Sequence, residues 1–383
     1  MNILMVHPHD LFSQQEPWTI RIRSLASEFK KQNHKIKLVY FPLNYTYKQK
    51  SFFLNGIEFI PLSRRLGIKI YIENIKFFYN ICDWSDIVHF QKCFYHSALP
   101  AMIGAILRGK PLHYDWDDWE IKIFRYSAHQ PWLADIFLST LERFIPNVCD
   151  TISVSSQRLK QVCIKYGFDH KKIVMAPVGA NLEEFNPQIS GLRIRDLYNI
   201  SGKIVTYLGQ LHGGQYAEQF IKAAKIILNK KKGIIFMVVG GGYRLDELKK
   251  LSNDLGLNAN FIFTGSIAHK DAPLYLAAAD IVVACFEDNE ITCCKSPLKI
   301  AEYLASGKMI VASDVGEVKA MLGGAGILTV PGEPQELSDG ILKFLSEPPL
   351  GKRLAKKARN RAEEIYNWTN TANNILKAYA MSL

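Results

Sequence analysis

The sequence predicts an α/β protein made of two Rossmann-like, doubly wound domains with parallel sheets. Short apolar runs alternate with segments of helical periodicity along almost the whole chain, which is typical of parallel strands connected by helices. The 383 residues exceed the size of one ordinary hydrophobic core, so two domains are expected. Ligands bind beyond the carboxyl ends of parallel strands, and we therefore expect the active site in a cleft where the two sheets face each other.

The expected strands fall into two series, separated by a break near Pro187–Gly202 where Asn-Pro-Gln-Ile-Ser-Gly interrupts the pattern. This break predicts one domain over residues 1–188 and a second over 189–365. The first series comprises Ile3–Val6, Ile36–Phe41, Ile87–Phe90, Leu112–Tyr114, Thr151–Val154 and Ile173–Ala176. The second comprises Ile204–Leu208, Ile234–Val239, Phe261–Thr264, Ile281–Ala284, Met309–Ala312 and Gly326–Val330.

Charge and cysteine content narrow the class of protein. The net charge of +11 implies an anionic partner. Nucleic acid is disfavoured, because the basic residues are spread over both expected domains and no DNA- or RNA-binding signature is present. Seven scattered cysteines without a repeated spacing favour a reducing compartment. Since no apolar stretch approaches the ~20 residues of a membrane-spanning helix, we expect a cytoplasmic protein, with peripheral association at the inner face of the plasma membrane as an option.

The segment Lys295–Lys308 carries the strongest sign of a ligand site. Its periodicity places Lys295, Lys299 and Glu302 on one face of a helix that Gly307 would end. Two cations and a carboxylate at a helix start suit an anionic ligand with hydroxyl groups, such as a nucleotide diphosphate-sugar.

Glycine-rich segments follow two of the expected strands. Gly240-Gly-Gly-Tyr-Arg244 lies between a strand and a helix, where backbone N–H groups can approach a phosphate. Gly209-Gln-Leu-His-Gly-Gly214 could form a second cradle, with Gln210 and His212 near phosphate or sugar. Either segment could equally be a tight turn without a ligand.

The segment Asp115-Trp-Asp-Asp-Trp-Glu120 gathers four carboxylates directly after a strand. Clustered carboxylates repel one another unless they are solvated or paired with cations. The segment is open to three interpretations: catalysis or recognition of sugar hydroxyls, an Asp-x-Asp site for a divalent metal, or an acidic loop that caps the following helix.

Residues 64–80 form an amphipathic pattern, with Ile68, Ile72, Ile75 and Tyr79 on one side. A surface helix that packs this row on its own sheet is the favoured interpretation. The alternative is contact with anionic lipid, because Arg64 and Arg65 precede the helix.

Several landmarks together resemble the family-four retaining glycosyltransferases of GT-B fold over nearly the whole length. They are Met1–Val6, the helix-to-strand passage Leu25–Ile36, Pro177–Pro187, Tyr207–Gln210, Val239–Gly242 and Phe263–Ser266. In the family, two glutamates separated by seven residues face the donor. Glu302 stands at the second position, where the resemblance implies a contact to the nucleotide ribose, whereas Cys294 stands at the first.

Other positions depart from the family and shift the expected donor contacts. Pro297 replaces a glycine and has no N–H to offer a phosphate. Gln210 replaces a basic residue, so the pyrophosphate is expected to rely on Lys295, Lys299 or Arg244. Asp117 stands close to the usual histidine of the N-terminal domain and is the candidate for orienting the sugar or acceptor. The remaining expected donor contacts are Ser296, Leu298, Gly209, Gly240, Gly241, Gly265 and Ser266.

The resemblance implies an enzyme that moves a hexose-type sugar from a nucleotide diphosphate-sugar to a hydroxyl of a glycan or lipid-linked acceptor, in cell-surface glycan or glycolipid synthesis. The first domain would hold the acceptor, the second would hold the donor, and residues 366–383 would form a helix that crosses back to the first domain. Asp117, Lys295 and Lys299 are the catalytic candidates, and no metal or other cofactor is expected. The alternatives are a metal-dependent transferase, a nucleotide-sugar epimerase and a non-catalytic binding subunit.

Overall fold

The computed structural model describes residues 1–13, 18–46, 50–65, 67–126, 131–211 and 216–383. Two compact units divide the chain, one of residues 1–177 with 368–383 and one of residues 178–367. The boundary expected after residue 188 thus lies inside the second unit. The reason is local: the backbone N–H of Val178 bonds Ser296 Oγ, and Ala180 forms a β-bridge with Asn367.

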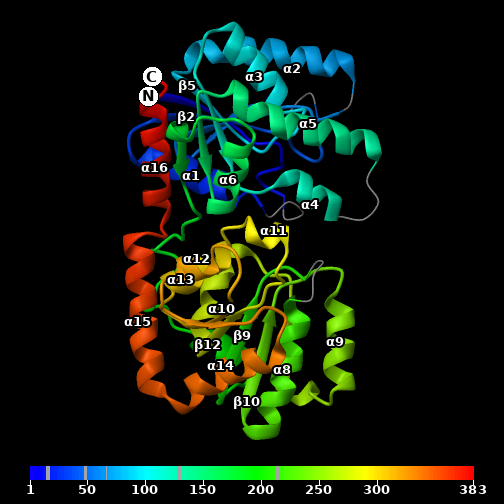
Figure 1. Ribbon diagram of the computed structural model, residues 1–383, viewed down its shortest axis with the longest axis vertical. Helices are drawn as coiled ribbons and strands as arrows, with labels where there is room; N and C mark the ends of the chain where they lie inside the picture. Colours follow the sequence, from blue (N-terminus) through cyan, green and yellow to red (C-terminus); the bar gives the residue numbers. More distant parts are fainter. Residues whose placement is uncertain (14–17, 47–49, 66, 127–130, 212–215) are drawn as a thin grey trace. The chain divides into compact units, whose positions relative to one another are not determined.

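The first unit, in which Figure 1 labels β2 and β5, contains an eight-stranded sheet. The order of its strands is β3-β4-β2-β1-β5-β6-β7-β8. All neighbouring strands are parallel except β3 and β4, which form an antiparallel hairpin. The strands are β1 (Asn2–Val6), β2 (Lys35–Tyr40), β3 (Phe52–Leu54), β4 (Ile57–Pro61), β5 (Ile87–Gln91), β6 (Leu112–Trp116), β7 (Thr151–Val154) and β8 (Ile173–Met175).

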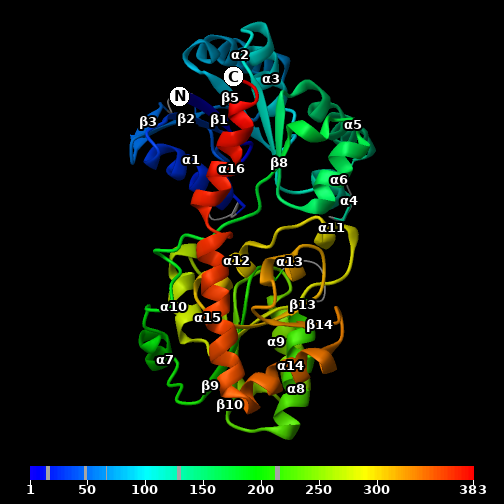
Figure 2. The ribbon, with the colours of Figure 1, turned by 60° about the vertical axis from the view of Figure 1, so that its left-hand side comes forward.

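Helices cover both faces of this sheet, as alternating strands and helices require. In Figures 1 and 2, α1 and α16 lie together on one side, and α2, α3 and α5 lie on the other. The helices are α1 (Ile20–Lys31), α2 (Ile68–Ile81), α3 (Ala98–Leu107), α4 (Glu120–Tyr126), α5 (Trp132–Val148), α6 (Gln157–Lys165) and α16 (Trp368–Ala380).

The hairpin of β3 and β4 was not among the expected strands. Its turn is Asn55-Gly56, and both residues have positive φ, at 50° and 73°. That dipeptide is the strongest short-range hairpin signal in a sequence. All three residues of β3 are exposed, so the apolar run characteristic of a buried strand is missing here.

The second unit contains a six-stranded parallel sheet of order β11-β10-β9-β12-β13-β14. Its strands are β9 (Lys203–Leu208), β10 (Ile234–Val239), β11 (Phe261–Gly265), β12 (Ile281–Ala284), β13 (Met309–Ser313) and β14 (Ile327–Thr329). Its helices are α7 (Leu192–Leu197), α8 (Tyr216–Lys230), α9 (Leu245–Asp254), α10 (Ala272–Ala278), α11 (Glu290–Cys293), α12 (Leu298–Ala305), α13 (Val318–Leu322), α14 (Pro334–Ser346) and α15 (Pro348–Glu364).

Helix α2 departs from the packing that was favoured from the sequence. It packs inward through Asn74 and Phe78, while Ile68 and Ile72 are 76% and 44% exposed. The expectation that the whole isoleucine row lies on the sheet is therefore wrong. Leu66, within the 64–80 segment, lies outside the described residues. Among the described helices, none is both long enough and apolar enough to cross a membrane.

Candidate active site

The carboxyl ends of β9, β10 and β11 bring the expected glycines of the second unit together. A Cβ atom at Gly240 would lie 1.9 Å from the carbonyl oxygen of Gly209, and one at Gly241 would lie 2.1 Å from Ser266 Oγ. The N–H of Gly240 donates to the carbonyl of Gly265 over 3.1 Å. With φ of 142°, Gly240 also has a backbone that other residues rarely adopt. The loops can therefore approach one another this closely only because these positions are glycines.

Helix α12 begins later than its periodicity indicated. It starts at Leu298 with Pro297 as N-cap, so Lys295 and Ser296 precede it and the expected single helical face of Lys295, Lys299 and Glu302 is wrong. A proline disfavours helical backbone at the residue before it, which explains the late start. Ser296 is buried and its hydroxyl accepts the N–H of Val178, so it supports the local chain rather than lying open.

Lys299 occupies the space beneath the loop after β9. Its Nζ lies 4.4 Å from the ring centre of Tyr207 and 5.5 Å from that of Phe286. A Cβ atom on Gly209 would come within 2.5 Å of this Nζ, so the glycine admits the ammonium. Burial lowers the pKa of Lys299 to about 8. A phosphate at this edge would meet a cation that has lost much of its hydration.

Glu302, on the same helix, is buried with its Oε1 atom 2.6 Å from His269 Nε2. The next residue anchors the helix to the sheet, because the hydroxyl of Tyr303 accepts the N–H of Leu208 and donates to the carbonyl of Val283. Glu302 is therefore a fixed carboxylate one turn along the helix from Lys299.

Two expected donor contacts are less well placed. The Arg244 guanidinium donates to both carboxylate oxygens of Glu247, over 2.9 and 2.6 Å, and to Glu218 over 3.3 Å. Its charge is thus already compensated. Gln210 is exposed, and His212, two residues further along the chain, lies outside the described residues.

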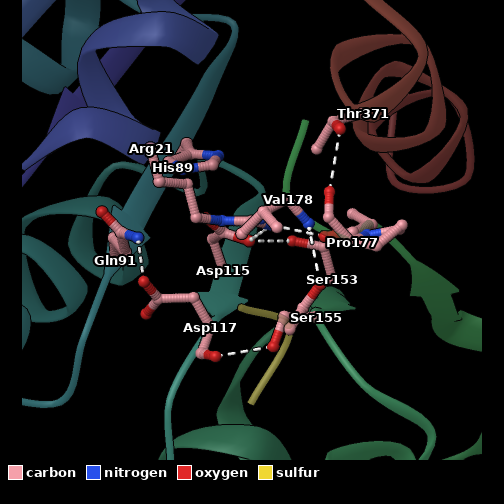
Figure 3. A network of polar contacts seen from close by, with 12 residues as sticks. Arg21, His89, Gln91, Asp115, Asp117, Ser153, Ser155, Pro177, Val178 and Thr371 are labelled. Carbon is pink, nitrogen blue, oxygen red and sulfur yellow. Dashed lines mark hydrogen bonds and ion pairs between the residues drawn. The ribbon is translucent and has the colours of Figure 1, made fainter. Parts of the chain in front are cut away.

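In the first unit, Asp115 lies at the end of β6 in a buried network (Figure 3). Arg21 Nε and Nη2 donate to its two oxygens over 2.7 Å each, and Ser153 Oγ donates over 2.6 Å. Burial alone would raise the pKa of Asp115, but the guanidinium holds it below its usual range. Asp115 is therefore an anion with a complete set of partners, which leaves it unsuited to bind a metal.

Asp117 is held from other directions, as Figure 3 shows. Gln91 Nε2 donates to its Oδ2 over 2.7 Å, and Ser155 Oγ donates to its carbonyl oxygen over 2.6 Å. Its other carboxylate oxygen lies 3.5 Å from Lys92 Nζ. Burial, together with the nearby carboxylates Asp118 and Asp115, raises the pKa of Asp117 to about 7.

The structure adds residues that the sequence analysis missed. Lys92 and Gln91 meet Asp117, Arg21 pairs with Asp115, and His269 meets Glu302. Gln91 and Lys92 stand at the carboxyl end of β5, so their position after an expected strand was a usable signal. His269 carried the same signal, because it lies in the loop that follows β11, whereas no comparable signal marked Arg21.

Family comparisons match both units. The family described as "Glycosyl transferases group 1" matches residues 195–361, and "Glycosyltransferase Family 4" matches residues 19–184. The chain belongs to the GT-B glycosyltransferases of these families. The expected family, enzyme class and fold are thereby confirmed, whereas no comparison tests the individual site residues.

Relatives and solved structures agree with this membership. An uncharacterised glycosyltransferase of Methanocaldococcus jannaschii, MJ1069, is 26% identical over 80% of this chain and 79% of its own length. Mannosylfructose-phosphate synthase of Agrobacterium fabrum is 25% identical over 61% of this chain and 54% of its own length. The crystal structure of Anabaena HepE in complex with UDP-glucose is 16% identical with a TM-score of 0.74, and the match covers 98% of this chain and 99% of that one.

Proposed function

We propose that this glycosyltransferase moves a hexose from a nucleotide diphosphate-sugar to a hydroxyl acceptor with retention of configuration. The observation that carries the proposal is the arrangement at the carboxyl edge of the second sheet. There Gly240, after β10, packs against Gly209, after β9, while Lys299 of α12 lies beneath Gly209 and Glu302 follows one turn further on. Close backbone approach and a cation suit the pyrophosphate, and a fixed carboxylate suits ribose hydroxyls.

In this reaction the bond between the sugar C1 and the phosphate oxygen breaks as the acceptor oxygen bonds to C1 on the same face. The acceptor hydroxyl gives its proton to the departing phosphate. The role of the protein is positioning and stabilisation of the leaving charge. We propose that Lys299 and Lys295 stabilise this negative charge. The Lys295 ammonium forms no ion pair with any residue that the structure describes. Arg244 contributes less, because Glu218 and Glu247 already compensate it.

We further propose that the first unit binds the acceptor, that Asp117 orients its hydroxyl or the transferred sugar, and that no metal is needed. The Asp-x-Asp alternative required Asp115 and Asp117 as a metal pair, but Asp115 is bound bidentately by Arg21. Activity should therefore survive excess EDTA. Loss of activity with EDTA and recovery with Mn²⁺ would favour the metal-dependent transferase instead.

A direct test begins with a thermal-shift screen of nucleotide sugars, followed by assays with the donor that stabilises the protein most. NMR of the product decides the stereochemistry: an inverted anomeric centre would overturn retention. An isomerised donor formed without acceptor would identify an epimerase. Nucleotide binding without turnover on a broad acceptor panel would identify a binding subunit, which the departures at Cys294 and Pro297 make worth testing.

We also propose that the lipid-linked or glycan acceptor is met at an anionic membrane surface. The supporting observation is the outer layer of the first unit, where α2, α3 and α5 lie on one side of the sheet (Figure 2). Large apolar side chains are exposed on all three helices, namely Ile68, Ile72, Ile106, Leu107, Trp132, Leu133, Ile136 and Phe137. Basic residues accompany them on α2, and such a combination favours anionic lipid surfaces.

Vesicle co-sedimentation tests the membrane proposal. Wild-type protein should bind vesicles that contain anionic lipid, release them at high salt, and lose binding when Lys69 and Lys76 are both changed to Glu. The matched control changes two exposed lysines of α9, Lys249→Glu and Lys250→Glu, and should bind normally. Equal binding by all three proteins, or binding that ignores lipid charge and salt, would refute this surface.

A further inference from the structure

A lysine is enclosed by carboxylates in the first unit. Lys92 Nζ lies 3.5 Å from Asp117 Oδ1 and 3.6 Å from Asp118 Oδ2, and it makes a still closer contact with Glu120 Oε1. Only 4% of the Lys92 side chain is exposed. A buried ammonium is costly unless it is paired, and here three carboxylates compensate it.

The backbone is arranged to place this side chain. Lys92 follows directly after β5 and has φ of 67°, in the left-handed region that residues other than glycine rarely adopt. This conformation is disfavoured for a residue with a side chain, and it persists only where surrounding contacts compensate it. Those contacts are the acidic residues after β6, which the turn at Lys92 allows its ammonium to reach.

The three carboxylates are spaced as a metal site would be. One oxygen from each of Asp117, Asp118 and Glu120 lies within 4.8 Å of the others. Oxygens at this spacing suit Mn²⁺ or Mg²⁺, which prefer carboxylate ligands. The Lys92 ammonium contacts all three residues, so a positive charge of the protein itself already occupies the centre of the group.

We infer that Lys92 is a built-in cation in the place of a divalent metal, and that it is a positioning residue for Asp117. The part that concerns Asp117 and the transferred sugar or acceptor rests on the proposed function. Lys92 fixes one oxygen of Asp117, Gln91 fixes the other, and Ser155 fixes its carbonyl. Without the ammonium, the three carboxylates repel one another and Asp117 leaves its place.

The test removes the Lys92 ammonium by mutation and then supplies other cations in solution. Lys92→Ala leaves space among the carboxylates, and we expect it to bind Mn²⁺, seen as loss of the free-ion EPR signal. Wild-type protein and the exposed control Lys165→Ala should not. Transferase activity of Lys92→Ala should fall ~10- to 100-fold and recover in part with Mn²⁺ or ethylammonium, because each restores a positive charge that positions Asp117.

A second variant separates charge from packing and covers a failure of the first to fold. Lys92→Met fills much of the same space without charge, so it should lose activity and regain none with either ion. If Lys92→Ala binds no Mn²⁺, or if both variants retain wild-type turnover, the inference is overturned. The Mn²⁺ titration needs no substrate, so it decides the built-in cation even if the proposed transfer reaction is refuted.

Discussion

The protonation state of Lys299 should make nucleotide binding at the proposed donor site depend on pH. Burial lowers its pKa from 10.5 to about 8 in the free protein, so a growing fraction is neutral above that pH. A pyrophosphate requires the charged form, and binding then includes uptake of a proton. We expect the affinity for a nucleoside diphosphate to be constant below about pH 7 and to fall roughly tenfold per pH unit above about pH 8, as measured by calorimetry.

Two variants test whether Lys299 causes this fall in affinity above pH 8. Lys299→Met should bind the nucleotide more weakly at pH 7 and without the decline above pH 8. Lys295→Met should also bind more weakly but should keep the decline, because Lys299 remains. A wild-type affinity that is flat from pH 7 to 9.5 would place the pyrophosphate away from Lys299.

Glu302 makes a different prediction, one about the sugar of the nucleotide. A buried carboxylate that accepts ribose hydroxyls should favour a ribonucleotide over its 2′-deoxy or 3′-deoxy analogue. Glu302→Gln should reduce that preference by roughly 10- to 100-fold, because a charged hydrogen bond contributes ~1.5–3 kcal/mol. His269→Ala should reduce it by less, since the histidine only orients the carboxylate over 2.6 Å.

The quantity to measure is the ratio of the affinities for the ribonucleotide and its deoxy analogue, and not the affinity for the ribonucleotide alone. Damage to the fold would weaken ribose and deoxyribose forms alike and leave their ratio unchanged. His170→Ala, an exposed histidine of the first unit, is the control and should keep the wild-type ratio. An unchanged ratio in Glu302→Gln would exclude a ribose contact.

At the scale of elements, the β3–β4 hairpin depends on its turn. Gly56 has φ of 73°, where a β-branched residue is strained, so Gly56→Val should lower the free energy of unfolding of the first unit by ~1–2 kcal/mol. Gly56→Asn is the matched control: its Cβ meets the same flexible Lys30 side chain, but asparagine tolerates this φ. Thermal melts of equal midpoint for both variants would contradict the strain argument.

The buried elements could be predicted from the sequence because parallel strands covered on both faces read as continuous apolar runs, as Ile234–Val239 does. The hairpin could not be predicted that way, since β3 is exposed at the sheet edge and only Asn55-Gly56 marks it. The late start of α12 was foreseeable from Pro297 alone.

The candidate site also has a part that could be predicted from the sequence and a part that could not. The glycine loops were predictable, because their role depends on backbone geometry directly after a strand. The partners of side chains were not: Arg21 meets Asp115, and His269 meets Glu302, across long sequence separations that only the folded chain closes. Local periodicity contains no information about such pairs.

At the scale of the whole molecule, the first unit is discontinuous in sequence. Residues 1–177 of the first unit come first in the sequence, and all of the second unit follows. The last part of the first unit, α16, comes only after it. That helix buries Ala372, Ile375 and Tyr379 in the core of the first unit, and the Tyr379 hydroxyl lies 2.7 Å from His89 Nδ1 in the sheet. The first core is therefore incomplete until the carboxyl end of the chain is available, whereas the second unit has all its strands beforehand.

This order predicts an asymmetric effect of truncation. Removal of residues 368–383 should lower hydrogen-exchange protection of β1, β5 and β8 while β9, β10 and β12 remain protected, because each large buried side chain contributes ~2 kcal/mol and the loss falls on one core only. Removal of residues 381–383, which follow the helix, is the control and should change neither sheet. Adding a peptide of residues 368–383 should restore protection in part. Equal loss in both sheets, or none in either, would show that α16 is not what completes the first unit.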